Sequence, residues 1–369
     1  MFNALMRARD RFFGDGEASV AIPVFDGPLK PNNALETAPV LLERDGLDDL
    51  LVAADGELLA SCRNEVLRIA ADGGTQVVAS FDHPIQAMAA SGEGLAVATG
   101  GRIVFHGGNA HGKHLDNIDG RPLSCVTALR EGAGGKLLVG HGSQQHPPEQ
   151  WSHDLLSHGA TGRAMEYDPA TGASRVLASG LEYCYGVCQD GGRVLACESW
   201  SHRVVAIEDG KSAAVVSALP GYPSRISPAA GGGYWLSVFA ARTQLLEFVL
   251  REDDYRREMM RTVEPRYWIA PALSSGVDFR EPLQLGSVRQ MGILKPWAPP
   301  RSYGLVIRLD ENLQPCYSLH SRAGGRNHGV VAAVEHAGDL LVLSKGAGRI
   351  LRLSLADMNL QDALHATHS

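Results

Sequence analysis

Short apolar runs separated by Gly-rich turns recur along most of the chain. Residues 162–238 hold two successive copies of this pattern, in which a turn at 190–192 or 231–233 separates two strand-like runs. The run after each turn, 194–197 or 234–237, is rich in residues that favour β-structure. Hairpins that repeat about every 40 residues are typical of propeller blades. The pattern therefore predicts a β-hairpin around each turn.

Six copies of the pattern can be counted along the chain. Their turns lie at residues 55–56, 92–94, 134–135, 190–192, 231–233 and 338–339. Strand-like residues near 20–24 and 39–42 remain available to complete a ring. Because circular closure removes exposed strand edges, we predict an all-β fold, a six-bladed β-propeller.

Two long insertions, residues 144–161 and 242–302, interrupt the third and fifth blades. The larger one contains a predicted helix from Gln244 to Leu250 that continues to Met260, and a Pro/Trp segment at 294–300. Both insertions connect a second strand to a third strand, and such connections lie at one mouth of the channel. We therefore expect helical or loop lids that roof one pocket there.

Residues 20–369 are predicted to form one propeller domain, preceded by a docking segment at 1–19. The first 13 residues mix basic and apolar side chains and lack the continuous apolar core of a signal peptide. We expect a short docking helix here. A helix that binds a membrane surface or a partner is the alternative.

The composition is that of a soluble globular protein, with 369 residues, 44% hydrophobic and 20% charged. A net charge of −7 spread along the chain argues against a nucleic-acid partner, and no apolar run is long enough to span a bilayer. The six cysteines form no CxxC pair, which favours free thiols in a cytoplasmic protein. A small molecule is the expected partner, and the oligomeric state stays open.

Several motifs distributed over residues 28–353 resemble the strictosidine-synthase-like family, relatives of paraoxonases and gluconolactonases. The resemblance is carried by the segments at 27–32, 162–172, 198–204, 219–223, 232–235 and 301–306. It implies the propeller architecture, and none of these motifs specifies a substrate.

Calcium-dependent members of this family hold the metal on the channel axis with Glu and Asn/Asp side chains from the inner strands. Here Asp48 keeps a carboxylate in the first blade, but the later positions read Ser124-Cys125, Tyr185 and Ser224-Arg225. A guanidinium only donates hydrogen bonds and cannot ligate a cation. We therefore expect no calcium and no other cofactor.

Strictosidine synthase itself needs no metal and uses a glutamate just after the second strand of blade five. In this chain Phe239 or an alanine falls at that place. The namesake condensation is therefore disfavoured.

Residues that begin inner strands or end second strands should gather at the roofed mouth. The catalytic candidates are Asp48, Asp49, Tyr185, Arg225, His141 and His328, and the candidate substrate contacts are Gln86, Cys125, Glu198, Ser224, Trp151 and Trp297, with Cys62 and Lys345 behind them. The carboxylates beside Arg225 suggest a general base and a cation that stabilises an oxyanion, and Tyr185 adds a hydrogen-bond donor. The alternative is an Asp–Arg pair that bridges blades in a polar core network.

Two histidines are candidate proton carriers near neutral pH, His141 at the end of a second strand and His328 before the sixth inner strand. A buried, hydrogen-bonded histidine is the alternative for both. The neighbouring His146, His153 and His158 lack the spacing that places zinc ligands on one helical face. Cys125 is a conceivable nucleophile, with a core thiol as the alternative.

These features favour a hydrolase of a lactone, ester or related cyclic substrate. One alternative is a metal-independent lyase or condensation enzyme for an amine or alkaloid-like compound. Retained carboxylates near an aromatic lid of Trp151, Trp268 and Trp297 would hold its cation. The other is a non-catalytic propeller that binds a metabolite or a protein.

Overall fold

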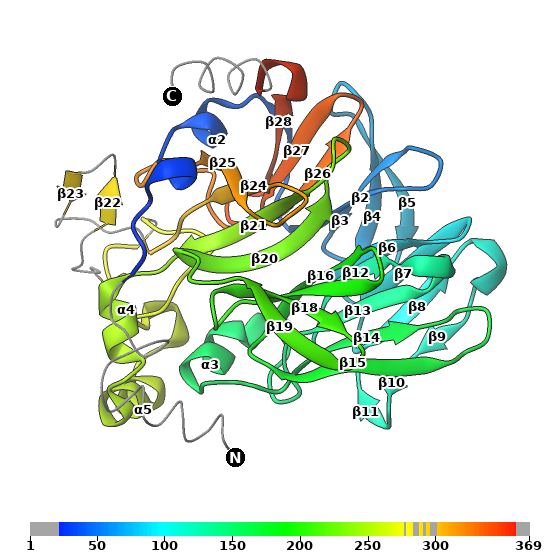
Figure 1. Cartoon of the computed structure of the whole chain (residues 1–369), viewed down its shortest axis with the longest axis horizontal. Helices are drawn as coiled ribbons and strands as arrows, with labels where there is room; N and C mark the ends of the chain where they lie inside the picture. The colour runs from blue at the N-terminus through cyan, green and yellow to red at the C-terminus, as the bar shows by residue number, and fades with distance from the viewer. Residues whose placement is uncertain (1–21, 277, 283–287, 291–292, 296–300, 359–369) are drawn as a thin grey trace.

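The computed structural model describes residues 22–276, 278–282, 288–290, 293–295 and 301–358. Six four-stranded antiparallel sheets surround one axis, so the predicted six-bladed β-propeller is confirmed (Figure 1). The proposed docking segment at 1–19 and Trp297 lie outside the described residues.

Each blade runs from an inner strand at the axis to an outer strand at the rim. The first holds β2 (Leu47–Val52), β3 (Leu58–Cys62), β4 (Glu65–Ile69) and β5 (Thr75–Ser80), and the second β6 (Ile85–Ser91), β7 (Gly94–Thr99), β8 (Arg102–His106) and β9 (His114–Leu115). The third holds β12 (Val126–Glu131), β13 (Leu137–His141), β14 (Gly162–Tyr167) and β15 (Ser174–Leu181), and the fourth β16 (Cys184–Asp190), β17 (Arg193–Glu198), β18 (Arg203–Glu208) and β19 (Lys211–Val216). The fifth holds β20 (Gly221–Pro228), β21 (Tyr234–Ala241), β24 (Leu305–Leu309) and β25 (Pro315–His320), and the sixth β26 (Val330–His336), β27 (Asp339–Ser344), β28 (Arg349–Ser354) and β1 (Val40–Glu43).

The sixth blade closes the ring with strands from both ends of the chain. β1 pairs antiparallel with β28, with Val40 opposite Leu351 and Glu43 opposite Arg349. The strand expected near residues 39–42 is thus present. The strand expected near 20–24 does not form over its described residues 22–24.

The Gly-rich turns fit the hairpins that they connect. Gly233 has a φ of +71°, and a Cβ there would collide with the backbone carbonyl of Leu309. Only glycine occupies such a position without strain.

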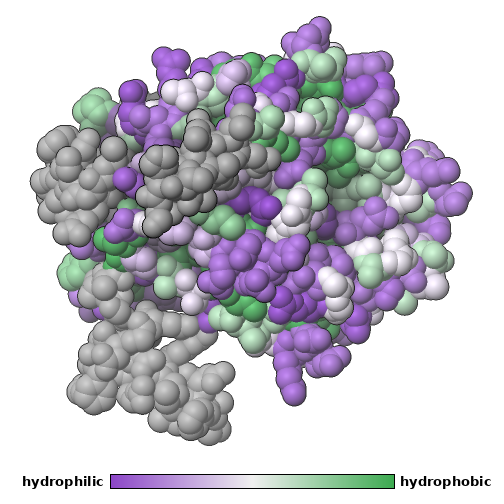
Figure 2. All heavy atoms as spheres, turned by 45° about the horizontal axis from the view of Figure 1, so that its top comes forward, coloured by the Kyte–Doolittle hydropathy of each residue, from purple (hydrophilic) through white to green (hydrophobic). Residues whose placement is uncertain are grey.

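The inner strands contact one another around the axis in the order β2, β6, β12, β16, β20 and β26, and β26 returns to β2. Their side chains are almost all buried, whereas outer strands such as β5 and β19 expose most of theirs. Apolar clusters fill the space between blades. On the face shown in Figure 2, hydrophilic residues cover much of the described surface.

Both insertions carry helices. α3 (Trp151–Leu156) lies between β13 and β14, while α4 (Gln244–Val249) and α5 (Asp253–Thr262) lie between β21 and β24. Figure 1 shows the three helices near one another, at one end of the molecule. Residues from all three join one apolar cluster with residues of the inner strands, so both insertions pack at the same mouth.

The single helix predicted from Gln244 to Met260 is wrong, because the structure has two helices there. α4 begins at its N-cap Thr243, whose Oγ1 accepts a hydrogen bond from the backbone N–H of Leu246. α5 begins anew with Asp253 and Asp254 in its first turn, where acidic side chains stabilise a helix N-terminus.

The remaining elements are short. They are η2 (Gly27–Leu29), α2 (Ala34–Thr37), η3 (Gly108–Ala110), β10 (Asn117–Ile118), β11 (Arg121–Pro122), η4 (Ala133–Gly135), η5 (Pro148–Gln150), η6 (Pro265–Tyr267), β22 (Val288–Gln290) and β23 (Ile293–Lys295). In the part of the chain that the structure describes, no helix has the length and apolar character needed to cross a membrane.

Candidate active site

Each inner strand has a β-bulge or similar irregularity, which falls at the second residue of five strands and at the fourth and fifth residues of β20. The residues that lack a partner at these irregularities are Asp48, Gln86, Thr127, Tyr185, Ser224 with Arg225, and Val331. A bulge leaves the extra residue outside the ladder and re-aims its side chain. The six bulges therefore direct side chains and backbone carbonyls toward one end of the channel.

Five of these residues, Asp48, Gln86, Tyr185, Ser224 and Arg225, were predicted from the sequence. The third-blade position is Thr127 rather than Cys125, and the sixth is Val331 rather than His328. Both corrections have the same cause, because the bulges fall one residue inside the strand rather than just before it.

Arg225 extends from the fifth blade across the channel. Its Nη1 donates to the backbone carbonyl of Asp48 at 2.7 Å, its Nη2 to that of Gln86 at 2.7 Å, and its Nε to that of Thr127 at 3.1 Å. Its side chain is 5% exposed. Burial would lower the pKa of Arg225, but Asp49 and Asp48 raise it above the ordinary value. One guanidinium thus joins the first, second and third blades to the fifth.

Asp49 is buried beside this guanidinium. Its two carboxylate oxygens accept the backbone N–H groups of Leu50 and Met88, each at 2.9 Å, and Oδ1 lies 3.5 Å from Arg225 Nε. Burial raises the pKa of Asp49 despite the opposing effect of Arg225. This geometry favours the polar-network alternative for Asp49 over contact with a substrate.

Asp48 lies on the open side of the guanidinium and is 21% exposed. Its Oδ2 lies 2.5 Å from Lys345 Nζ, and its Oδ1 lies 3.4 Å from Arg225 Nη2. Lys345 directly follows β27 and is 29% exposed. Burial would lower the pKa of Lys345, but Asp48 raises it, so that this ammonium stays charged. From the sequence, Lys345 was expected only behind the mouth. Its position directly after the second strand of a blade was the signal that could have placed it at the mouth.

Tyr185 completes the partly exposed group. Its ring centroid lies 5.6 Å from Arg225 Cζ, within range of a cation–π contact. Burial raises the pKa of Tyr185, with Lys345 and Arg225 opposing it. The phenol is therefore neutral near pH 7 and can donate a hydrogen bond.

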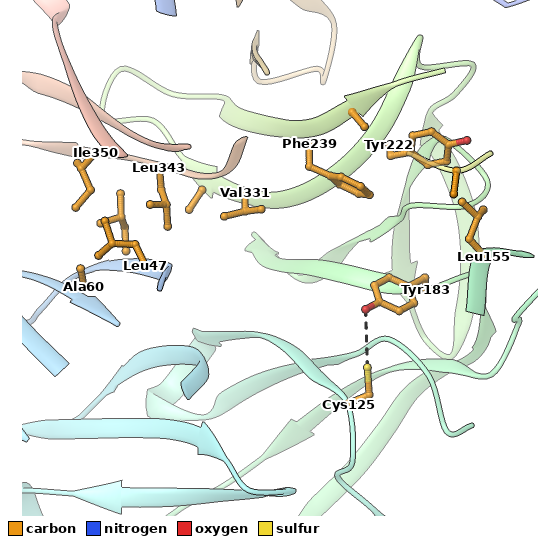
Figure 3. Close-up of a cluster of buried hydrophobic side chains, with 14 of the residues drawn as sticks. Leu47, Ala60, Cys125, Leu155, Tyr183, Tyr222, Phe239, Val331, Leu343 and Ile350 are labelled. Atoms are coloured by element: carbon orange, nitrogen blue, oxygen red, sulfur yellow. Dashed lines mark hydrogen bonds between the residues drawn. The ribbon is translucent and has the colours of Figure 1, made fainter. Parts of the chain in front are cut away.

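Six aromatic rings form a wall beside these groups, which we call the aromatic wall. It consists of Trp151, Tyr183, Tyr185, Trp200, Tyr222 and Phe239. Tyr183 stacks on Trp200 at 4.4 Å between centroids, and Phe239 lies 5.5 Å from Trp151 and 5.7 Å from Tyr185. Figure 3 shows Tyr183, Tyr222 and Phe239 of the wall together with apolar residues of other blades.

The insertions contribute to this wall and support it. α3 supplies Trp151, which is half-buried, and Asp154, whose Oδ1 accepts the indole N–H of Trp200 at 2.8 Å. The larger insertion reaches the sixth blade, where a Cβ at Gly346 would collide with the carbonyl of Leu273. Trp268 is buried and donates its indole N–H to the carbonyl of Val263, so it does not offer an open face to a cation.

Both candidate histidines are buried. His141 Nε2 accepts the backbone N–H of Cys125 at 3.2 Å, and burial lowers the pKa of His141 to about 3. His328 bonds Ser302 Oγ through Nδ1 at 2.7 Å and the carbonyl of Arg322 through Nε2 at 2.8 Å, and burial lowers its pKa too. These contacts favour the buried, hydrogen-bonded alternative for both.

Three of the predicted substrate contacts are also buried. Burial raises the pKa of Cys125 to about 12, which leaves an unreactive thiol. Glu198 accepts hydrogen bonds from Arg203 Nε at 2.6 Å and from the backbone N–H of Glu182 at 3.0 Å. Ser224 donates to the carbonyl of Val330 in the next blade. Gln86, in contrast, is half-buried, as is Trp151.

The axial residues do not fit the calcium that the resemblance implies for some relatives. The oxygens that face the axis, on Asp48, Gln86 and Thr127, already accept hydrogen bonds from Arg225. A guanidinium cannot ligate a cation. Among the described residues, no group of three or more His, Cys, Asp or Glu side chains is arranged to hold a metal ion.

Comparisons with known proteins agree with this architecture. A sequence profile of the strictosidine synthase family matches residues 131–207. Strictosidine synthase-like protein 6 of Arabidopsis thaliana is 29% identical over 146 residues, which is 38% of this chain and 39% of the relative. An adipocyte plasma membrane-associated protein of Salmo salar is 26% identical over 256 residues, 65% of this chain and 54% of the relative. The chain thus spans about half or less of the length of these curated relatives.

Among solved structures, a gluconolactonase from Xanthomonas campestris superposes with a TM-score of 0.55 at 14% identity. The superposition covers 90% of this chain and 97% of the gluconolactonase, which shows a shared fold. The chain is thus similar to the strictosidine synthase family over residues 131–207, as its motifs predicted, and it shares the propeller fold of the gluconolactonase.

Proposed function

We propose that this protein is a small-molecule hydrolase that opens a lactone, an ester or a related cyclic substrate at the channel mouth. One observation carries the proposal. Asp48 is a partly exposed carboxylate held between two cations, Lys345 and Arg225, with the phenol of Tyr185 near the same guanidinium. A base, an ammonium and a hydroxyl donor are groups that can catalyse carbonyl hydrolysis.

Asp48 is the base in this proposal. Among the described residues its Oδ1 contacts Arg225 alone, at the long distance of 3.4 Å, so it retains capacity to accept a proton from a water molecule. The water oxygen then attacks the substrate carbonyl carbon, and the carbonyl electrons move to its oxygen. When that tetrahedral intermediate collapses, the C–O bond to the alcohol breaks, and Asp48 returns the proton to the leaving oxygen.

Lys345 and Tyr185 would stabilise the oxyanion. The ammonium has three N–H donors and uses one on Asp48 within the described structure, which leaves two for a substrate. The raised pKa of Lys345 keeps it charged, and the raised pKa of Tyr185 keeps its hydroxyl proton in place. The positive charge that stabilises the oxyanion would thus come from the Lys345 side chain.

The aromatic wall favours a substrate with an apolar or aromatic body. Trp151 and Tyr185 are its half-buried members, and Tyr185 also belongs to the polar group. Phe239 contacts both rings, so a substrate ring that packs on Trp151 would extend along this wall toward Tyr185. The gluconolactonase with the same fold acts, by its name, on a lactone, so sugar lactones belong in any first screen.

The test is turnover of a panel of sugar lactones, aryl-substituted lactones and aryl esters, measured in a chelating buffer. The wild type should hydrolyse at least one class, and Asp48→Asn should lower kcat by about 10²- to 10⁴-fold, the usual contribution of a general base. Asp55→Asn, in the exposed turn of the same blade, is the matched control and should retain full activity. Full activity of Asp48→Asn would refute the site assignment. Tight binding of a panel compound without turnover would favour the binding-only alternative.

A further inference from the structure

We infer that the guanidinium of Arg225 acts as a built-in cation at the channel axis, which neutralises the oxygens of three bulges and makes this site independent of any bound metal ion. The inference concerns the architecture of the axis and does not rest on the proposed hydrolase activity. The evidence is the set of atoms that surround the Arg225 side chain.

Five oxygens from three blades face the guanidinium. They are the backbone carbonyl oxygens of Asp48, Gln86 and Thr127 and the Oδ1 atoms of Asp48 and Asp49, at 2.7 to 3.5 Å from its nitrogens. The three carbonyls belong to bulge residues, which lie outside the regular ladder. A buried carbonyl without a partner is costly, and Arg225 supplies that partner for all three.

Without the guanidinium this cage would be unstable. Two carboxylates and three carbonyl dipoles would face one another, with Lys345 bound to one side of Asp48 only. Such a cluster of oxygens is also the environment that hard cations such as Ca²⁺ prefer. Arg225 therefore supplies the positive charge and fills the space at once, and a covalently attached cation cannot dissociate.

Removal of this guanidinium should turn a metal-independent site into a cation-dependent one. Replacing Arg225 with a short neutral side chain should leave an oxygen cage that requires a diffusible cation. Arg225→Ala should consequently melt at a lower temperature in chelator than the wild type does. Millimolar Ca²⁺ or millimolar methylguanidinium, which resembles the missing side chain, should restore at least half of that loss.

The chain offers a matched control in Arg163. This arginine is also buried, and its Nη1 donates to the carbonyl of Ile118, but no carboxylate pairs with it among the described contacts. Its Nε and Nη2 have no hydrogen-bond partner within the described structure. Arg163→Ala should also melt at a lower temperature, and neither calcium nor methylguanidinium should restore it.

The experiment compares melting temperatures of the wild type, Arg225→Ala, Arg225→Lys and Arg163→Ala in chelator, in Ca²⁺ and in methylguanidinium, together with the metal content of the purified wild type. The wild type and Arg225→Lys should be indifferent to calcium. Stoichiometric calcium in the wild type, a melting temperature of the wild type that calcium raises, or a folded Arg225→Ala that responds to neither cation would each overturn the inference. Should Arg225→Ala yield no soluble protein, Arg225→Lys decides: indifference to calcium supports the built-in cation, and stabilisation by calcium refutes it.

Discussion

Lys345 Nζ lies 2.5 Å from Asp48 Oδ2, and this contact joins residues that are 297 positions apart in the chain. It links the last blade to the first, on the open side of the guanidinium of Arg225. Asp48 is therefore held on both sides by a positive charge. The same pairing that fixes the carboxylate also holds an ammonium beside it.

Lys345→Met is expected to lower kcat on the true substrate by about 10²- to 10³-fold, the typical cost of losing an oxyanion donor. The KM should change little, because the donor acts mainly in the transition state. Steady-state kinetics of the purified variant measure both. The stability should fall by about 1 kcal/mol at most, since the pair is partly exposed.

Lys136→Met is the matched control for this variant. Lys136 forms a comparable ion pair, 3.0 Å from Glu166, on the outer part of the third blade. Its loss should leave kcat unchanged. Equal kinetic losses in both variants would remove Lys345 from the proposed mechanism.

Trp151→Ala is expected to raise KM about tenfold, which corresponds to roughly 1.4 kcal/mol of lost ring contact. The reason is that Trp151 is a half-buried ring of the aromatic wall, 5.5 Å from Phe239 and 6.2 Å from Trp200. Phe248→Ala removes an exposed ring from α4 instead and should leave KM as it is. A KM that responds to neither change would show that the substrate does not bind along this wall.

The sequence located the axial residues well wherever the repeated pattern marks the start of an inner strand. Asp48, Gln86, Tyr185, Ser224 and Arg225 were found in this way, and the resemblance to the family marks the same positions for all of them except Gln86. Cys125 and His328 were displaced from the bulge positions Thr127 and Val331. A bulge depends on hydrogen bonding between two strands, and the apolar pattern of one strand does not record it.

The other departures have a tertiary cause. Whether His141 lies at an open mouth or in the core depends on the insertion that follows it, where Gln144 contacts its ring. Lys345 gains its place from the reach of a long side chain across the ring closure. Neither the burial of His141 nor the position of Lys345 can be obtained from local sequence. Both depend on segments that only the fold brings together.

Cys125→Ala is expected to keep the wild-type kcat, because burial raises the pKa of this thiol to about 12 and removes it from the substrate. Five of the six cysteines are buried, and Cys316 is exposed. A thiol reagent should therefore modify one cysteine in the native protein and all six in denaturant. Cys316→Ser should abolish the native reaction, and a rapid second thiol would show that a buried cysteine is accessible.

Stability is expected to fall as the pH is lowered from neutral toward 4, because buried histidines resist protonation. Burial lowers the pKa values of His141 and His320 to about 3 in the folded protein, whereas an unfolded histidine titrates near about 6.5. Between these values the unfolded chain binds more protons than the folded one. Each histidine therefore makes stability decrease by about 1.4 kcal/mol per pH unit as the pH falls. The buried carboxyl of Asp49, whose pKa is raised, acts in the opposite sense above its unfolded value.

Urea unfolding at a series of pH values between 7 and 4.5 measures this slope. His320 bonds the hydroxyls of Tyr303 and Ser318, so His320→Gln will lower stability at every pH, and the informative quantity is the slope rather than the level. His141→Gln and His320→Gln should each reduce the slope by about 1.4 kcal/mol per pH unit, and the double variant by the sum, because the two residues share no hydrogen-bond partner in the described structure. Variants that keep the wild-type slope would mean that these rings are protonated in the folded protein, and His141 would then return as a proton carrier.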